Sequence, residues 1–331
     1  MTMPALLSHR RLFGSLSVLL ALTLALVVLS LCVGSTSYRP WQLLDNSEQA
    51  LIARDVILEL RLPRTLAALA VGGLLALAGA LQQLLLRNAL ADPYVLGTSG
   101  GASVGALSAM FLGAGAATIN LAAASGAFLT MLLVFVFAGR DYSSQQARLL
   151  LTGVALASFF GALSSLLLTI APESLLRGMI FWLLGDLAGA QWQLAMATLL
   201  GLLMILTPFA RELNLLSLGQ QPAHALGAQT RHLQWLLYFV AAIATAIAVT
   251  TAGMIGFVGL IVPHALRLLL GQDQRLLLPA CALGGGMILL AADIGSRVAF
   301  APVQLPVGII TALLGAPAFL WLLRIPYRSK A

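Results

Sequence analysis

Long apolar segments separated by short polar ones are the feature that most constrains how this chain can fold. Only 9% of the 331 residues are charged and 60% are hydrophobic, whereas a water-soluble domain carries about 25% charged residues. So few charges cannot cover the surface of a soluble protein of this size. A soluble enzyme, a disordered chain and a secreted disulfide scaffold are therefore excluded, and lipid is the expected solvent for most of the molecule.

Ten segments approach the length of about 20 apolar residues that a helix needs to cross a bilayer. The first has a basic start like a signal peptide, but its apolar core is too long and no small-residue cleavage motif follows it. We therefore expect an all-α membrane protein, a single transmembrane domain over residues 1–331, with an amphipathic piece at 172–185 lying at the interface. The predicted spans are 12–33, 65–86, 95–112, 119–138, 148–170, 191–208, 234–252, 255–270, 277–297 and 307–324.

The distribution of basic residues predicts how these spans are oriented. An even number of spans puts both termini on one side, and cytoplasmic loops are enriched in Arg and Lys. With the N-terminus inside, twelve basic residues fall in inner segments and six fall outside, so both termini are predicted to be cytoplasmic. The inner residues are Arg10, Arg11, Arg87, Arg140, Arg148, Arg211, Arg231, Arg267, Arg275, Arg324, Arg328 and Lys330, and the outer ones are Arg39, Arg54, Arg61, Arg64, Arg177 and Arg297.

Two regions of similar pattern indicate an inverted internal repeat. Residues 65–112 hold a long span, a polar turn and a Gly/Ser-rich span, and residues 234–270 hold a long span, a glycine-bounded turn and a span broken by Pro263. The first region begins outside and the second begins inside. Short spans interrupted by Gly or Pro at corresponding positions are typical of a transport path.

The residue types that carry common catalytic chemistry are scarce. Lys330 is the single lysine, so the 331 residues contain no P-loop and no interior lysine that could form a Schiff base. If the protein uses ATP, a separate chain would have to hydrolyse it. The four histidines are isolated and offer no metal-ligand spacing, and Cys32 and Cys281 lie in apolar runs as small buried residues. We expect no metal site, no cofactor and no nucleic-acid partner.

Charged residues at the outer ends of two spans are candidates for a docking surface. Arg61 and Arg64 are three residues apart, on one face of the second span, where the helix dipole does not favour cations. They either pair with local acids such as Asp55 and Glu59 or meet an acidic partner arriving from outside.

Asp293 is an intramembrane acid, which is a functional candidate by default. Its i,i+4 spacing to Arg297 favours a structural ion pair. Arg297 is then expected at the outer surface, where it can join Arg61 and Arg64.

The longest inner loop, 209–233, contains a candidate contact helix. Pro222 suits the first turn of a helix and Gly227 suits its end, so a short exposed helix is expected between glycines. The loop is either a plain connector or a projection that inserts into the groove of a cytoplasmic partner.

Two other classes of function stay open from the residues alone. Ser99 in a Gly-rich setting, with His264 in another span, allows an intramembrane serine protease, although small residues are equally explained by close helix packing. An ion- or proton-coupled secondary transporter would need several unpaired intramembrane acids, and the spans offer only Asp293.

Several short motifs follow one another in a characteristic order from about residue 55 to 324. They are Leu62-Pro63-Arg64-Thr65, Asn88-x-Leu90-Ala91-Asp92-Pro93-x-x-Leu96-Gly97-x-Ser99-x-Gly101-Ala102, Arg148-Leu149-Leu150-Leu151-x-Gly153, Gly256-Phe257-x-Gly259-Leu260-x-x-Pro263-His264-x-x-Arg267, Ala292-Asp293 and Leu305-Pro306-x-Gly308. Together they resemble the FecCD family, the permease subunits of type II ABC importers for ferric siderophores, haem and cobalamin.

The resemblance implies a homodimer in the bacterial inner membrane with a translocation path along its two-fold axis. Two ATP-binding cassette subunits would bind in the cytoplasm and use the ATP, and one periplasmic substrate-binding protein would bind outside. The cargo would be an iron compound, haem or a ferric siderophore, or else cobalamin. We favour an iron compound because iron carriers make up the larger part of the family.

The resemblance also implies roles for particular residues. Arg61, Arg64 and Arg297 would meet glutamates of the binding protein. The coupling helix that seats in the ATPase would include Leu218, Gly219, Ala223, Leu226 and Gly227, and the narrow inner part of the path would include Asn88, Leu90, Gln145, Gln146 and Ala147. The chain departs from the family pattern at Ala89, at Gln145-Gln146-Ala147 and at Gln220-Gln221-Pro222.

Overall fold

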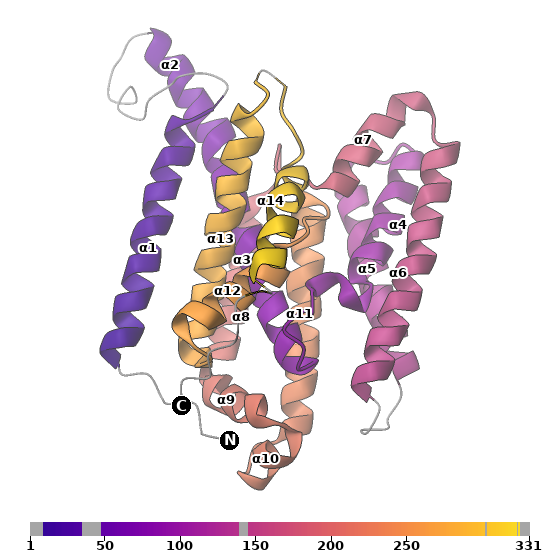
Figure 1. The fold of residues 1–331 in the computed structure, drawn as a ribbon. Coiled ribbons are helices and arrows are strands. Elements are labelled where there is room, and N and C mark those ends of the chain that lie inside the picture. Colours follow the sequence, from indigo (N-terminus) through magenta and orange to yellow (C-terminus); the bar gives the residue numbers. More distant parts are fainter. Residues whose placement is uncertain (1–8, 35–47, 139–144, 302, 323, 325–331) are drawn as a thin grey trace.

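The computed structural model describes residues 9–34, 48–138, 145–301, 303–322 and 324, which are helical apart from short links. Figure 1 shows the long helices lying side by side along one direction. The α-helices are α1 (His9–Cys32), α2 (Glu48–Asp55), α3 (Leu62–Leu85), α4 (Thr98–Phe111), α5 (Ala116–Ala138), α6 (Gln145–Ile170), α7 (Glu173–Leu184), α8 (Trp192–Leu206), α9 (Ala210–Leu218), α10 (Gln220–Ala225), α11 (Thr230–Ala252), α12 (Val258–Leu270), α13 (Gln274–Val298) and α14 (Val307–Leu322). A π-helix, η2 (Val56–Arg61), and two 3-10 turns, η3 (Pro93–Leu96) and η4 (Thr207–Phe209), complete the described elements.

Each predicted span corresponds to a helix, but the helices differ in length. Seven described helical segments are long and apolar enough to cross a membrane. The helices α4, α12 and α14 have only 14, 13 and 16 residues, and at 1.5 Å per residue each is shorter than a hydrocarbon core of about 30 Å. The count of ten spans therefore stays a prediction, whereas the expected all-helical membrane architecture is confirmed.

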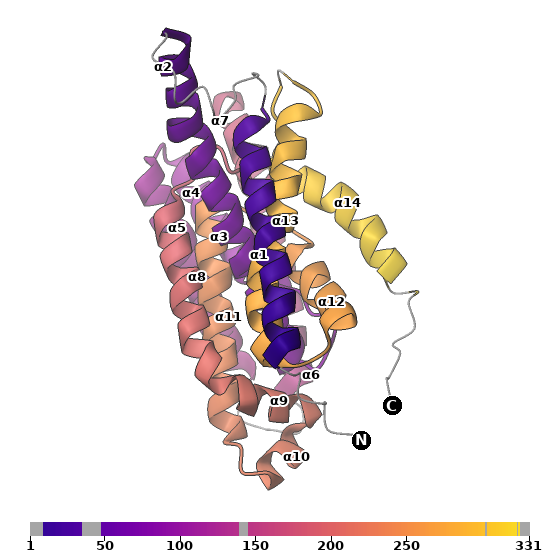
Figure 2. The ribbon, with the colours of Figure 1, turned by 90° about the vertical axis from the view of Figure 1, so that its left-hand side faces the viewer.

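Helix α3 forms the centre of the fold. It packs against α13, α11, α12 and α8, and every residue from Ala70 to Leu86 is buried. Figure 2 shows α3 between α1 and α13 on one side and α8 and α11 on the other. A helix that is apolar on all its faces is expected to be buried in this way.

Glycines let the backbones of these central helices approach closely. A Cβ at Gly72 would overlap the main-chain oxygen of Gly285 on α13, and a Cβ at Gly79 would overlap that of Gly259 on α12. Close approach at small residues is the usual way in which membrane helices gain packing contacts.

The charged stretch before the second span contains a helix that the sequence did not lead us to expect. Helix α2 continues through η2 into α3, so that one helical segment of 36 residues runs from Ala50 to Leu85. The π-helical turn ends at Arg61, two residues before Pro63. A proline ring clashes with the carbonyl four residues earlier, here that of Glu59, and the wider turn accommodates it.

The helices α4, α5, α6 and α7 lie together on the other side of α11, at the right of Figure 1. Outward-facing apolar residues cover α5 and α6, for example Phe128 at 63% exposure and Phe159 at 58%. Exposed apolar side chains on this scale suit contact with lipid or with another subunit.

Candidate translocation path and coupling surfaces

The two broken regions have the same local design. In the first, Gly97 (φ 72°) caps the start of α4, and in the second, Phe257 (φ 70°) caps the start of α12. Both residues are left-handed, which is an ordinary conformation for glycine and a strained one for phenylalanine. The long helices before them run in opposite directions, because α3 begins near α2 and α11 begins near α10 (Figure 1).

The two breaks contact each other at the centre of the molecule. Tyr94 Oη donates to the main-chain oxygen of Ile255 and accepts from its N–H, each over 3.0 Å. The ring of Pro93 covers Gly259, where a Cβ would collide with it. One tyrosine hydroxyl thus satisfies two main-chain groups that the interrupted helix leaves unpaired.

Two adjacent amides attach the first break to the rest of the core. Gln83 Nε2 donates to the main-chain oxygens of Ala91 and Leu260, and its Oε1 accepts from Arg267 at 2.9 Å. Gln82 Nε2 donates to the oxygen of Pro93 at 3.1 Å. Sequence reasoning missed both residues, although two consecutive glutamines in an apolar span were a usable signal.

The predicted inner gate begins with a tight exposed turn. Asn88 Oδ1 accepts the N–H of Leu90 at 2.9 Å, and Leu90 is 48% exposed. The turn is therefore closed by Asn88 even though alanine follows it where the family has proline. Gln145, Gln146 and Ala147 begin α6, and their side chains lie outside the described part of the structure.

The predicted coupling helix is a separate short element. Helix α10 lies between Gly219 (φ 128°) and Gly227 (φ 87°) at the lower end of the molecule in Figure 1. Ala223 is fully buried, Leu218 is half-buried and Leu226 is 50% exposed. This end therefore exposes an apolar side chain at the surface of the molecule.

The inner turn and the coupling helix touch through Arg87. This residue directly precedes Asn88, and a Cβ built on Gly219 would lie 2.5 Å from its Nη2 atom. Glycine at position 219 is thus favoured by its backbone conformation (φ 128°), and the Arg87 side chain would have to move to admit a larger residue.

A buried polar cluster joins the start of α13 to α9. Asn214 donates to Asp273 at 3.0 Å and accepts the N–H of Gln274 at 2.8 Å, while Arg275 pairs with Asp273 at 2.7 Å. Burial alone raises the pKa of Asp273, but hydrogen bonds from Arg275 and Asn214 outweigh it and hold the pKa at about 2.

The outer arginines come together, but inside the fold. Arg61, Arg64 and Arg297 are 5%, 8% and 4% exposed. Arg64 Nε lies 2.6 Å from Asp293 Oδ1, and Arg297 Nε lies 3.0 Å from Asp293 Oδ2 at the expected i,i+4 spacing. Asp293 thus sits between two guanidinium groups, and Arg64 uses this acid instead of a local one.

The end of α1 explains why the arginines are buried. Arg61 Nη1 donates to the main-chain oxygens of Leu31 and Cys32, and Arg297 Nη1 donates to those of Ser30 and Val33. The last carbonyls of a helix lack partners within the helix and carry the negative end of its dipole. The dipole argument from the sequence considered only α3, whereas the cations serve the C-terminus of α1.

The serine protease alternative has no support in the geometry. No hydrogen bond joins Ser99 to His264 among the described residues, and the buried His264 Nδ1 has no partner there. The described residues also contain no group of three His, Cys, Asp or Glu side chains that could hold a metal ion.

Comparison with known proteins places this geometry in context. The model of the FecCD transport family matches residues 22–325. The vitamin B12 import system permease protein BtuC of Salmonella arizonae is 40% identical over 311 residues, which cover 91% of each chain. The protein of the same name from Salmonella newport is 40% identical over 307 residues, covering 91% of this chain and 92% of its own.

Two solved structures share the fold. One, assigned as a metal-chelate type ABC transporter in an inward-facing conformation, has a TM-score of 0.83 at 35% identity and covers 94% of this chain and 98% of its own. PsaBC from Streptococcus pneumoniae in complex with Fab has a TM-score of 0.56 at 17% identity, over 88% of this chain and 96% of its own. The second likeness concerns the fold alone.

Apolar helices with paired breaks at the centre and a short exposed helix at one end define a multi-pass membrane transport protein. The chain belongs to the FecCD transport family. It is the permease subunit of an ABC importer: it is not catalytic, it binds no cofactor, and a separate ATPase chain hydrolyses the ATP. The importer also includes a substrate-binding protein. Both the secondary transporter and the protease alternatives are thereby excluded.

Proposed function

We propose that the importer carries cobalamin. The proposal rests on the relatives named as vitamin B12 permeases, which are 40% identical to this chain over 91% of its length. Our expectation from the sequence favoured an iron compound. An iron chelate, haem or a ferric siderophore, is the second candidate, because the metal-chelate transporter is 35% identical over 94% of the chain.

The proposed assembly is a homodimer with two ATPase subunits on the cytoplasmic side and one periplasmic binding protein. Apolar side chains on α5 and α14 are exposed, for example Phe128 at 63% and Leu314 at 67%. Such surfaces suit contact with a second permease subunit as well as with lipid, which supports the homodimer. We propose that both termini are cytoplasmic. The excess of basic residues on that side supports this orientation, as does the start of α1 at the end that carries α9 and α10.

The coupling helix is proposed to receive the motion of the ATPase. Its exposed Leu226 would insert into a groove of that partner, and Arg87 would pass the displacement from Gly219 to the turn at Asn88 and Leu90. Together with Gln145, Gln146 and Ala147, this turn would open and close the inner side of the path. Alternating access then follows from coupling to two conformations of the ATPase pair.

The docking role of Arg61, Arg64 and Arg297 stays a proposal in a narrower form. Only the few exposed atoms of these side chains would be available to glutamates of a binding protein. Asp293 pairs with Arg64 and Arg297, and Asp186 lies 3.9 Å from Arg64, so these two acids offset part of the positive charge that would steer such a partner.

Transport by the reconstituted complex tests the cargo. The permease, its ATPase and its binding protein are placed in liposomes, and ATP-dependent uptake of labelled cobalamin, of haem and of a ferric siderophore is measured separately. Uptake of cobalamin with no uptake of haem supports the proposal. Uptake of haem or a ferric siderophore in the absence of cobalamin uptake overturns it in favour of the second candidate.

The coupling proposal has its own test. Leu226→Asp in the reconstituted complex should lower transport per ATP hydrolysed at least tenfold, because a charge cannot enter an apolar groove without a partner. The matched control is Gln229→Ala, an exposed change three residues further on. Normal coupling in Leu226→Asp would reject the assignment of α10.

A further inference from the structure

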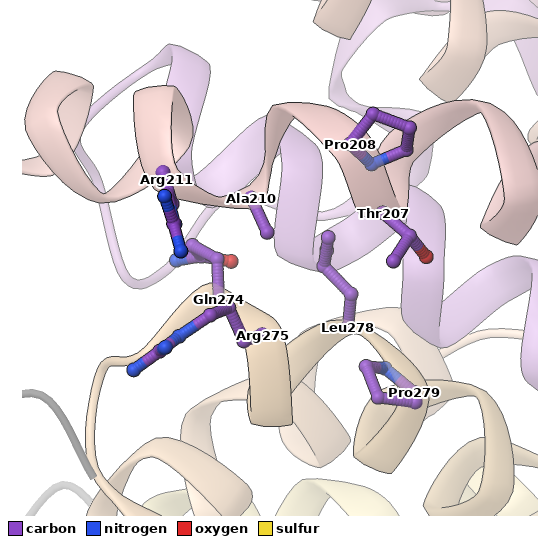
Figure 3. Close-up of a pocket in the computed structure, with 8 residues that line it drawn as sticks. All are labelled: Thr207, Pro208, Ala210, Arg211, Gln274, Arg275, Leu278 and Pro279. Atoms are coloured by element: carbon purple, nitrogen blue, oxygen red, sulfur yellow. The ribbon is translucent and has the colours of Figure 1, made fainter.

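A cavity of about 350 Å³ lies between the end of α8 and the start of α13. This volume is within the range of about 300–1,000 Å³ typical of small-molecule sites. Figure 3 shows its lining: Arg211 and Arg275 lie toward one side, and Thr207, Pro208, Leu278 and Pro279 lie toward the other. One end of the cavity is thus cationic and the other is mostly apolar.

The cationic end carries more positive than negative charge. Arg211 is exposed and makes no ion pair or hydrogen bond with the described residues. Arg275 pairs with Asp273, yet its side chain keeps 23% of its surface exposed. The Asp273 side chain is 3% exposed, and its carboxylate oxygens already accept hydrogen bonds from Arg275 and Asn214. The accessible guanidinium of Arg211 therefore lies at this end, and Arg275 lines it while its own guanidinium pairs with Asp273.

The apolar end continues onto the outer surface of α8. Met204 and Ile205 are 74% and 49% exposed. Met204 precedes Thr207 and Pro208 by three and four residues, which places it on the same side of the helix. An acyl chain lying along this face would end at the cavity.

The cavity also lies at the level where membrane helices end. Helix α8 gives way to η4 after Leu206 and α13 starts at Gln274, and these two helix ends are where we expect hydrocarbon to give way to water. Basic pockets between transmembrane helices on the cytoplasmic side are suited to acidic lipid headgroups, and arginine binds phosphate oxygens with two parallel hydrogen bonds.

We propose that this cavity binds the headgroup of an anionic phospholipid. Arg211 and Arg275 bind the phosphate, and the acyl chains follow Leu278, Pro279 and the exposed face of α8. A free phosphate ion would use only the cationic end, whereas a phospholipid uses both. None of the lining residues belongs to the predicted inner gate or to the predicted coupling residues between Leu218 and Gly227, although Arg211 lies on α9, which ends at Leu218.

Native mass spectrometry of the purified permease–ATPase complex tests the site. Dioleoyl phosphatidylglycerol or dioleoyl phosphatidylcholine is added, and the bound lipid is counted for the wild type, Arg211→Gln and Arg231→Gln. The control, Arg231, is an exposed arginine at the start of α11, outside the cavity. A second variant, Thr207→Trp, fills the apolar end while leaving both arginines in place.

The expected result is tight binding of phosphatidylglycerol in the wild type and in Arg231→Gln, with about fivefold weaker binding in Arg211→Gln, since one arginine near a lipid surface contributes about 1 kcal/mol. Thr207→Trp should weaken it as well. Equal binding by all variants, or equal binding of the two lipids, would overturn the proposal. Full displacement by millimolar inorganic phosphate would assign the cavity to a free anion, and loss of the ATPase from Arg211→Gln with unchanged lipid binding would assign it to a protein contact.

Discussion

Arg61 Nη1 donates a hydrogen bond to the main-chain oxygen of Leu31 over 2.7 Å. Through this bond the helical segment that forms the centre of the fold holds the end of α1. Arg297 makes the equivalent contacts from α13 to Ser30 and Val33. The first helix, which packs against the core mainly through α13, is thus fixed at its outer end by charge-assisted hydrogen bonds.

Arg61→Leu should loosen α1. It removes the donors to the carbonyls of Leu31 and Cys32, and hydrogen bonds to charged groups contribute about 1.5–3 kcal/mol. Thermal unfolding of the detergent-solubilised protein should therefore occur at a lower temperature. Arg54→Leu, at an exposed position on α2, is the control and should leave the unfolding temperature unchanged. Equal unfolding temperatures for the two variants would contradict the assignment.

Asp293→Asn should destabilise the protein by about 3–5 kcal/mol, because the buried Arg297 loses its acid and Arg64 keeps only the longer contact of 3.9 Å to Asp186. Adding Arg64→Gln removes one of the stranded cations. The double variant should therefore be less destabilised than the sum of the single variants. Strict additivity in chemical denaturation would show that the three groups do not form one cluster.

Tyr94→Phe should open the contact between the two breaks. The N–H and carbonyl of Ile255 each lose a partner, at a cost of about 1–3 kcal/mol per buried group. Hydrogen exchange at residues 253–257 should be at least tenfold faster than in the wild type. Tyr238→Phe removes a hydroxyl that binds Met131 on α5, so exchange at 253–257 should stay slow in that variant.

Gly79→Ala should lower the folded yield, because the new Cβ would overlap the main-chain oxygen of Gly259. Relief requires α3 and α12 to separate, at a cost of about 1–3 kcal/mol or more. Gly161→Ala on α6 is the matched change, since no atom lies within 4 Å of its new Cβ. Similar yields from both variants, measured by size-exclusion chromatography, would argue against close packing at Gly79.

Asp273 predicts how stability depends on pH at the α9–α13 junction. Its folded pKa of about 2 is below the ordinary value of 3.8, so the unfolded chain binds the proton more tightly. The stabilisation is present above about pH 4 and is lost as the pH falls toward 2. Asp273→Asn should flatten this part of the curve of unfolding free energy against pH; an unchanged slope would mean that Asp273 does not carry it.

Much of the fold follows from local patterns in the sequence. Apolar runs locate the helices, Gly97 and Gly253 mark the two broken regions, and Gly219 and Gly227 bound the short helix of the inner loop. The expected interruption at Pro263 is wrong, because α12 continues through this residue. Each of these signals depends on residues within one or two turns of one another. A single sequence is enough to predict these features, because the backbone conformation of a residue depends on its own type and on the residues next to it.

The contacts of the candidate site join residues that are distant in the sequence, so they are harder to predict from the sequence alone. Arg61 looks like an exposed cation until the carbonyls of Leu31 and Cys32, about thirty positions earlier, are brought beside it. Gln83 likewise binds Arg267 across 184 positions. Helix α2 was missed for another reason. Its charged residues indicate a segment exposed to water, and we did not expect a helix there. A helix can nevertheless extend into water when it continues one that is already formed in the core.

The unequal helix lengths give the protein an uneven fit to its bilayer. The 36-residue segment from Ala50 to Leu85 is about 54 Å long at 1.5 Å per residue, well beyond a hydrocarbon core of about 30 Å. The 16 residues of α14 reach only about 24 Å, yet Leu313, Leu314 and Trp321 face outward. Where lipid and not a second subunit covers α14, the bilayer must become thinner to match it, so hydrophobic mismatch varies around the perimeter of the molecule.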